Sequence, residues 1–198
     1  MPIYLDEKLI EPQGDDLQSA LDEADTILQD TSRIVIEVKI DGHVLLGEEF
    51  DTAAGIITIG KKIEFMSGEP AQLANDALRE IIGDLDQARR LHIQAAEAFQ
   101  QDQTESAMQC INQITEIWQQ VIHAVTLVSP IKGIDIEVDE YQNQKITQLT
   151  DDLLQKLSEL KVMIQDSDTL GIADVLSYEW PETVDAWEKF IQWMISHD

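Results

Sequence analysis

The stretch "SGEPAQLA" (residues 67–74) marks the point at which the spacing of the apolar residues changes for the rest of the chain. Before it, apolar and polar residues alternate in short runs that suit strands, with one helical segment among them. After it, every apolar stripe has the helical period. Pro70 can occupy the first helical turn, where its missing N–H is not needed, and Ser67 or Gly68 can act as the cap. The stretch therefore predicts a boundary between two kinds of structure.

We expect two domains, a small α/β-type domain in residues 1–68 and a helical bundle domain in residues 69–198. In the first domain, residues 2–12 alternate around a polar centre and suit two very short paired strands, and residues 56–66 suit another strand. Residues 15–30 carry a helical stripe, and two aspartates precede it where a helix N-terminus favours negative charge. One helix is thus expected to pack on a small, mainly antiparallel sheet.

The segment "IVIEVKIDGHVLL" (34–46) contains the strongest turn signal in the sequence. Asp41-Gly42 lies between two alternating runs and favours a two-residue hairpin, because both turn positions need a positive φ. The alternation of the first run also predicts which side chains share a face of the strand. This set consists of Ile34, Ile36, Val38 and Ile40.

Three long apolar stripes follow in the second domain, separated by short polar or Pro- and Gly-containing turns. The middle stripe has a strict 3-4-3-4-3 spacing, which is typical of a heptad seam. Its members are Ile111, Ile114, Trp118, Val121, Val125 and Val128. Helices of this length joined by short loops usually lie antiparallel. The predicted fold class is therefore α+β, a small mainly antiparallel sheet with one packed helix followed by an antiparallel bundle of three to five helices.

The last helical region, "SYEWPETVDAWEKFIQWM", keeps one apolar stripe in phase through Pro181. We expect two nearly continuous helical pieces bent at Trp180-Pro181, because a proline inside a helix removes a hydrogen bond and kinks the axis. Trp180 and Trp187 are predicted to lie in the core. Phe190 and Trp193 lie beside the stripe and are the candidate partner-binding residues, since aromatic side chains are enriched at interaction hot spots. Ordinary burial of these two rings is the alternative.

The chain is strongly acidic: 39 Asp and Glu residues face 13 Lys and Arg residues, which gives a formal net charge of −26. Such a surface repels phosphate backbones and anionic lipid headgroups, so we expect neither direct nucleic-acid binding nor membrane binding. Hydrophobic residues make up 43% of the sequence, which is enough for a core and argues against a disordered chain. The charge would speed encounter with a basic partner. A plain solvated surface is the alternative explanation.

The sequence contains no recognisable motif for catalysis, metal binding or cofactor binding. One cysteine and four scattered histidines do not supply a zinc site, and no histidine has the Glu-x-x-His spacing of a di-iron bundle. Two aspartate-rich stretches, 135–146 and 166–177, lack ligands that a calcium loop requires. A nucleophile pair of Cys110 with His92 or His123 would need adjacent helices to bring the two together, and packing roles are the simpler expectation. We therefore predict no catalytic residues, no metal and no cofactor.

Together these observations predict a non-enzymatic cytoplasmic protein that binds a protein partner through its helical bundle or a sheet edge, as an adaptor or chaperone does. The single cysteine and the lack of an apolar run of membrane-spanning length favour the cytoplasm. In size, acidity and helical content the chain resembles the small acidic chaperones that guard secreted or flagellar subunits in bacteria. The alternatives are an acidic decoy that occupies a nucleic-acid-binding surface and, with less support, an enzyme without a recognisable motif. A homodimer is compatible with each of them.

Overall fold

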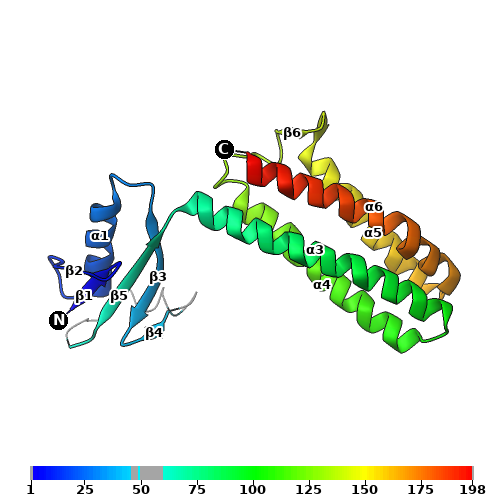
Figure 1. Ribbon diagram of the computed structural model, residues 1–198, viewed down its shortest axis with the longest axis horizontal. Coiled ribbons are helices and arrows are strands. Elements are labelled where there is room, and N and C mark those ends of the chain that lie inside the picture. Colours follow the sequence, from blue (N-terminus) through cyan, green and yellow to red (C-terminus); the bar gives the residue numbers. More distant parts are fainter. Residues whose placement is uncertain (1, 46–48, 50–59, 198) are drawn as a thin grey trace. The chain divides into compact units, whose positions relative to one another are not determined.

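The computed structural model describes residues 2–45, 49 and 60–197, and it divides into two compact units, Met1–Leu73 and Ala74–Asp198 (Figure 1). Among the described residues, the first unit holds a five-stranded sheet with one helix, and the second holds four long helices and a two-stranded hairpin. Each unit has its own cluster of buried apolar side chains. The predicted α+β class, with a small sheet followed by a helical bundle, is confirmed.

The sheet of the first unit has the strand order β2-β1-β5-β3-β4. Its strands are β1 (Ile3–Leu5), β2 (Lys8–Ile10), β3 (Ile34–Ile40), β4 (His43–Val44) and β5 (Ile63–Gly68). Neighbouring strands pair antiparallel except β1 and β5, which run parallel. Of the strand predicted around residues 56–66, the described part begins at Ile63, and residues 56–59 lie outside the described residues.

Helix α1 (Leu17–Leu28) covers one face of this sheet. Asp16 caps the helix by accepting a hydrogen bond of 2.7 Å from the backbone N–H of Ser19, which satisfies one of the free amides of the first turn. The buried stripe of the helix consists of Leu17, Ala20, Ala24 and Leu28. Small alanines in this stripe allow the helix to approach the sheet closely, and the core forms between the two.

The predicted hairpin turn is confirmed at Asp41 and Gly42, whose φ angles are 52° and 85°. Ile40 pairs with His43 across it, so β3 and β4 are joined by a two-residue loop. Positive φ at both central positions is the geometry that matches the twist of the flanking strands. Two further two-residue hairpins follow the same rule, at Asp6-Glu7 and at Gln142-Asn143.

Gly42→Val should lower the free energy of unfolding of the first unit by about 1–2 kcal/mol, because a side chain with a branched β-carbon is strained at positive φ. An added Cβ at this position meets no atom within 4 Å, so the expected loss comes from backbone conformation and not from a clash. Thermal melts followed by circular dichroism measure the effect. Gly83→Ala is the control, since Gly83 lies in a helix with equally open space around it. An unchanged melt of Gly42→Val would contradict the turn assignment.

A β-bulge in β3 changes the predicted pattern of faces. The ladder to β5 shifts between Val35 and Glu37, so Ile36 is the extra residue. Val35 packs with the core, whereas Ile34 and Ile36 are 50% and 40% exposed. The prediction that these two isoleucines share a face of the strand with Val38 is wrong, because the inserted residue reverses the alternation and puts Val35 on the side of Val38 instead.

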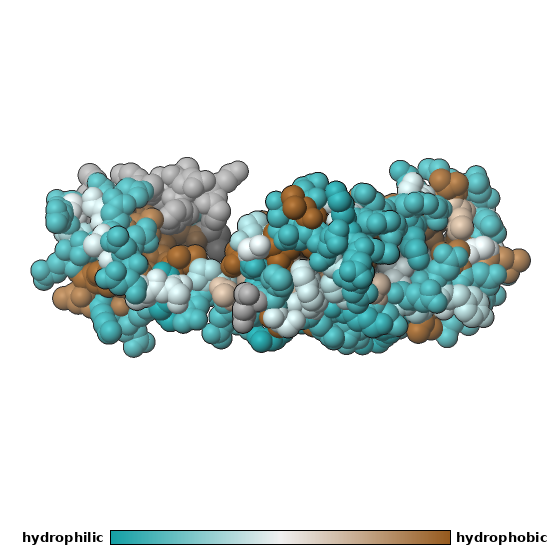
Figure 2. Space-filling model, turned by 90° about the horizontal axis from the view of Figure 1, so that it is seen from above, coloured by the Kyte–Doolittle hydropathy of each residue, from teal (hydrophilic) through white to brown (hydrophobic). Residues whose placement is uncertain are grey.

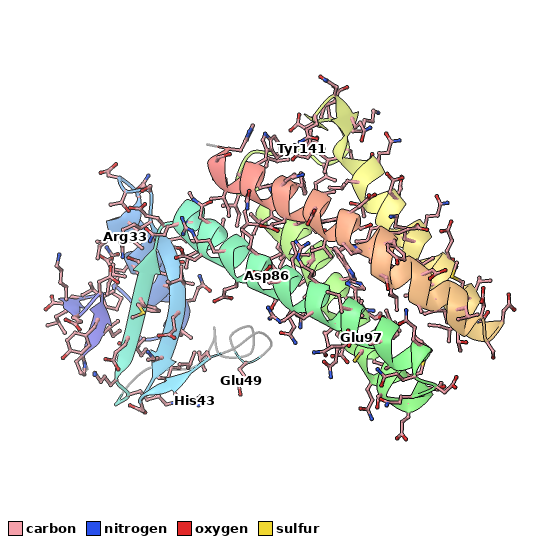
Figure 3. The ribbon with its side chains drawn as sticks, turned by 45° about the vertical axis from the view of Figure 1, so that its right-hand side comes forward. Arg33, His43, Glu49, Asp86, Glu97 and Tyr141 are labelled. Carbon is pink, nitrogen blue, oxygen red and sulfur yellow. The ribbon has the colours of Figure 1, made fainter. Side chains whose placement is uncertain are left out.

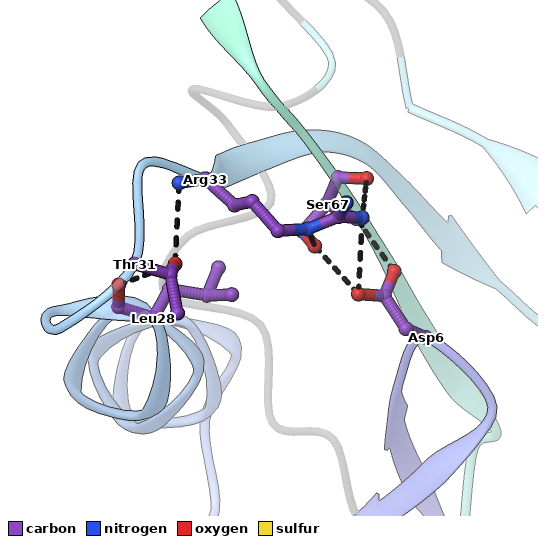
Figure 4. A network of polar contacts seen from close by, with 5 residues as sticks. All are labelled: Asp6, Leu28, Thr31, Arg33 and Ser67. Carbon is purple, nitrogen blue, oxygen red and sulfur yellow. Dashed lines mark hydrogen bonds and ion pairs between the residues drawn. The ribbon is translucent and has the colours of Figure 1, made fainter.

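Ser67 does not cap the helix that follows it, because it belongs to a polar network of the first unit (Figure 4). The carboxylate of Asp6 accepts hydrogen bonds from the backbone N–H (2.8 Å) and hydroxyl (2.5 Å) of Ser67. Arg33 donates to the hydroxyl and the carbonyl oxygen of the same serine, at 2.8 Å and 2.7 Å. The backbone N–H of Ser67 is the main reason that the pKa of Asp6 lies below its usual value. Strand β5 instead continues to Gly68, and the helix begins at Pro70.

The second unit is a bundle of four helices that run alternately in opposite directions (Figure 1). They are α3 (Pro70–Gln100), α4 (Thr104–Val128), α5 (Ile146–Gln165) and α6 (Thr169–Ser196). The heptad seam of α4 is buried at every predicted position. Short loops join α3 to α4 and α5 to α6, while the longer connection from α4 to α5 contains a small hairpin.

Helix α6 continues through Pro181 as one helix. Proline has no N–H, so the carbonyl of Ser177 lacks its usual partner at this point. The apolar stripe nevertheless stays on one face: Trp180 and Trp187, on either side of the proline, are 0% and 1% exposed. The prediction that both tryptophans lie in the core is confirmed.

Candidate functional site

A hairpin between α4 and α5 builds the most distinctive surface of the bundle. Its strands are β6 (Glu140–Tyr141) and β7 (Gln144–Lys145), which lead directly into α5. The tight turn at Gln142 and Asn143 has φ angles of 53° and 64°. Asparagine tolerates this left-handed conformation better than most residues, which is the local reason for the turn.

The hairpin, the start of α5 and the second half of α6 enclose a cavity of about 310 Å³. Ligand-binding pockets usually begin at about this size. The residues from the hairpin and α5 that line it are Tyr141, Gln142, Gln144, Lys145, Ile146 and Leu149. Those from α6 are Glu182, Asp185, Ala186 and Lys189, which share one face of the helix. We call this cavity the hairpin groove.

Tyr141 forms the aromatic wall of the hairpin groove. Its ring centroid lies 5.3 Å from that of Phe190 and 5.3 Å from that of Trp193, so the hairpin is held against the C-terminal part of α6. Figure 3 labels Tyr141 beside this end of α6. Burial raises the pKa of its phenol above the usual value. The hydroxyl accepts a hydrogen bond of 2.9 Å from the side-chain amide of Gln142, which fixes the ring at the rim.

The structure separates the two predicted partner-binding residues. Phe190 is 0% exposed and packs between the rings of Trp187 and Tyr141, so its side chain belongs to the core. Trp193 is half-buried and stacks on Phe190 at a centroid distance of 5.8 Å. An exposed Phe190–Trp193 pair is therefore not present, because the hairpin covers the phenylalanine. Trp193 is the member of the pair that retains accessible surface.

The charges around the hairpin groove are divided into paired and unpaired groups. On α3, Arg89 binds two carboxylates of α6, Asp185 at 2.5 Å and Glu188 at 3.1 Å. The hydrogen bond to Asp185 is the main reason that the pKa of Arg89 is raised. Lys145 and Lys189 make no ion pair with any described residue. The rim thus offers two unpaired ammonium groups on a chain of net charge −26.

The ring of Tyr141 in the groove wall belongs to a continuous series of aromatic rings that passes through the bundle core. Neighbouring ring centroids lie 4.8–5.9 Å apart, within the range of favourable aromatic contacts. From the inside outward, the rings are His92, Trp180, Trp118, Trp187, Phe190, Tyr141, Trp193 and His197. All four tryptophans of the sequence belong to this series.

His92 lies at the inner end of the series, completely buried and stacked on Trp180 at 4.8 Å. Neither of its ring nitrogens has a hydrogen-bond partner. Burial lowers its pKa to about 4, and the positive charge of Arg89 acts in the same direction. The backbone carbonyl of Ala88 acts to raise the pKa, although it makes no hydrogen bond with either ring nitrogen. His92 is therefore a neutral core side chain near neutral pH.

The described residues do not assemble the catalytic or metal sites considered from the sequence. The thiol of Cys110 does not pair with His92, since both nitrogens of that ring are unpartnered, and His123 is exposed. Over residues 2–45, 49 and 60–197, no three His, Cys, Asp or Glu side chains gather closely enough to hold a metal ion. Within the same residues, none of the helices combines the length and the apolar character needed to cross a bilayer.

The fold and the groove define an α+β protein whose four-helix bundle carries a hairpin-walled cavity. Residues 76–190 match the family model described as "Domain of unknown function (DUF8042)", and the match covers more than half of the chain. The chain therefore belongs to this family. No curated protein and no solved structure matches the chain. The family region contains every residue that lines the hairpin groove and leaves out the sheet of the first unit.

Proposed function

We propose that this protein is a non-enzymatic binding protein, and that the hairpin groove receives a segment of a partner protein. The observation that carries the proposal is the composition of the groove: an aromatic wall, an apolar floor and a charged rim around about 310 Å³. Protein recognition sites commonly combine an aromatic anchor, a desolvated centre and a polar rim. A cavity of this size suits a few side chains of an extended or helical segment.

The floor and rim of the groove favour binding over catalysis. Ile146, Leu149 and Ala186 offer apolar surface, and Gln142 and Gln144 offer amide groups that can donate and accept hydrogen bonds. Catalysis by acid–base or nucleophilic chemistry needs a nucleophile or proton carrier held by a second group. Of the carboxylates in the groove, Asp185 is already neutralised by Arg89.

An adaptor or chaperone-like role in the cytoplasm accords with these features. The chain has one cysteine, which cannot form a disulfide within the chain, and such sequences are typical of reducing compartments. The charge of −26 keeps the protein soluble and steers basic surfaces of a partner toward it. We expect the charge to set the rate of encounter and the groove to set which partner stays bound.

Ala186→Arg should abolish capture of the partner, because a long charged side chain on α6 fills the groove without disturbing buried residues. The measurement is quantitative mass spectrometry of proteins retained from native lysate by the tagged full chain. Leu127→Arg is the matched control: it makes the same change of charge at an exposed position of α4. A protein that is lost with Ala186→Arg and kept with Leu127→Arg is the expected partner.

The opposite pattern would count against the proposal. If the same proteins are retained by the wild type and by Ala186→Arg, the groove is not the binding surface. Circular dichroism of both variants establishes that the bundle is intact. Since arginine is a good helix former, neither change should weaken the helix itself.

A further inference from the structure

The sheet of the first unit has a second face, opposite α1, on which apolar side chains reach the surface. The exposed fractions of the large ones are high: Leu9 60%, Met66 51%, Ile34 50% and Ile36 40%. The side chain of Leu73, in the first turns of α3 and 41% exposed, lies next to them beside Gly68. Apolar (brown) atoms also appear at the surface of this unit in Figure 2. Monomeric proteins rarely gather exposed apolar side chains of this size on one face without a binding role.

Two features of the backbone place these side chains together. The bulge in β3 turns Ile34 and Ile36 outward, as shown above. Gly68 lies directly opposite Ile34 on β5, and a Cβ there would come within 2.9 Å of the side chain of Ile36 and 3.4 Å of Leu73. Because Gly68 has no side chain, the side chains of Ile36 and Leu73 can both lie over this position of β5. Met66 lies on the same side of β5, two residues earlier.

Most of the charges on this face are paired within the face. Lys39 binds Glu37 at 2.5 Å, and Lys62 binds Glu64 at 2.6 Å. Arg33 contacts the carboxylate of Asp6 at 3.4 Å. These are three of the five basic residues in residues 1–70, a segment that also contains 16 acidic residues. Most of the cations of this acidic unit therefore lie around the exposed apolar side chains of this face.

The face also has a projection and a hollow side by side. A cavity of about 580 Å³ opens among Tyr4, Arg33, Lys39, Glu64 and Met66, together with neighbouring residues. Leu9, on the edge strand β2, pairs with Tyr4 on β1 and projects from the surface beside the cavity. A surface that carries both a projection and a hollow can be complementary to itself, which a twofold interface requires.

We propose that this sheet face binds the same face of a second copy of the chain. Two copies of net charge −26 repel one another wherever their unpaired carboxylates meet. Four carboxylates line the hollow of this face, and three of them, Asp6, Glu37 and Glu64, have a cation. Each copy therefore brings only one unpaired carboxylate of the hollow, that of Glu7, to the contact. A basic partner would find few free carboxylates on this face, and an acidic partner would find few free cations. The paired charges and the exposed apolar side chains therefore fit an identical face best.

The proposal makes a specific prediction for the effect of salt. The remaining charge of each copy opposes association at long range, and salt screens it. Between about 0.01 M and about 1 M salt the Debye length falls from about 30 Å to about 3 Å. Dimerisation of the full chain, measured by sedimentation velocity over a range of protein concentrations, should therefore become stronger as salt rises. An interface held by unpaired charges of opposite sign would show the reverse.

Substitutions on the face should weaken the dimer, and matched substitutions elsewhere should not. Met66→Lys and, separately, Leu9→Lys should each raise the dimer dissociation constant at least tenfold. Val162→Lys on the bundle, where the side chain is 51% exposed like that of Met66, should leave it unchanged. All three positions are exposed, so folding is expected to survive, and circular dichroism checks it for each variant.

Two results would overturn the proposal. One is a monomer at every protein concentration in high salt. The other is a dimer whose dissociation constant is insensitive to both Met66→Lys and Leu9→Lys, which would place the contact on another surface. Because Ala186→Arg alters the groove alone, it should leave the dimer intact, so this experiment and the test of partner binding can fail independently.

Discussion

Trp187→Ala should lower the free energy of unfolding of the bundle by about 3–5 kcal/mol. The ring is 1% exposed and contacts Trp118 at 5.8 Å and Phe190 at 5.9 Å, so its removal leaves a cavity in the middle of the aromatic series. Urea denaturation followed by tryptophan emission measures the loss. All four tryptophans lie in the bundle, so this signal reports the unfolding of the second unit.

The neighbouring aromatic residues provide the comparison. Phe190→Ala should cost a similar amount, because the structure places this ring in the core. Trp193→Ala should cost clearly less, since its ring keeps some contact with solvent. Equal losses for Trp187→Ala and Trp193→Ala would mean that the outer end of the aromatic series is as essential to the fold as its middle. A small loss for Phe190→Ala would contradict its assignment to the core.

His92 should make the bundle less stable in mild acid. Its pKa is about 4 in the folded protein and about 6.5 in an unfolded chain, so the unfolded state takes up the proton first as the pH falls. The stabilisation is complete above pH 6.5 and is lost progressively as the pH falls toward 4. Between about pH 7.5 and about pH 5, this single group should remove about 2 kcal/mol of stability. A charge on the imidazole would gain some cation–π energy from Trp180, so the loss does not exceed this amount.

The carboxylates also titrate in this range, so the effect of His92 is measured as a difference. His92→Phe keeps a flat ring against Trp180 and removes the titratable group. The gap in stability between His92→Phe and the wild type should widen in favour of the variant as the pH falls. A gap that is constant with pH would show that folding does not lower the pKa of His92.

The spacing of the apolar residues predicted those parts of the fold that depend on the sequence of a single helix or turn. The seam of α4 and the stripe through Pro181 are buried as predicted, because a helix fixes which side chains share a face. The turn at Asp41-Gly42 was equally predictable, since few residues accept positive φ at two successive positions. The bulge in β3 was not, because it depends on the partner strand and leaves the alternation of its own residues intact.

The hairpin groove could not be predicted, because its walls come from segments that are distant in sequence. Residues 129–140, which contain a Pro and a Gly, indicated only that a helix ends there, and the one local signal of a hairpin was Asn143 in a polar run. That hairpin determines which of the two predicted aromatic rings, Phe190 or Trp193, remains accessible to solvent. Tyr141 covers Phe190 and leaves Trp193 at the edge. Spacing on α6 alone places the two rings near the edge of the buried stripe but carries no information about what covers them.

The most direct test of partner binding in the hairpin groove is site-specific photocrosslinking from inside it. A benzophenone side chain at Gln144, an exposed residue of β7 that lines the groove, should crosslink to the partner when the full chain is irradiated in native lysate. The same group at Leu127, exposed on α4, serves as the control. We expect a discrete crosslinked protein from Gln144 that is absent from Leu127 and disappears with Ala186→Arg. A partner that crosslinks from Leu127 and not from Gln144 would contradict the assignment of the binding site to the groove.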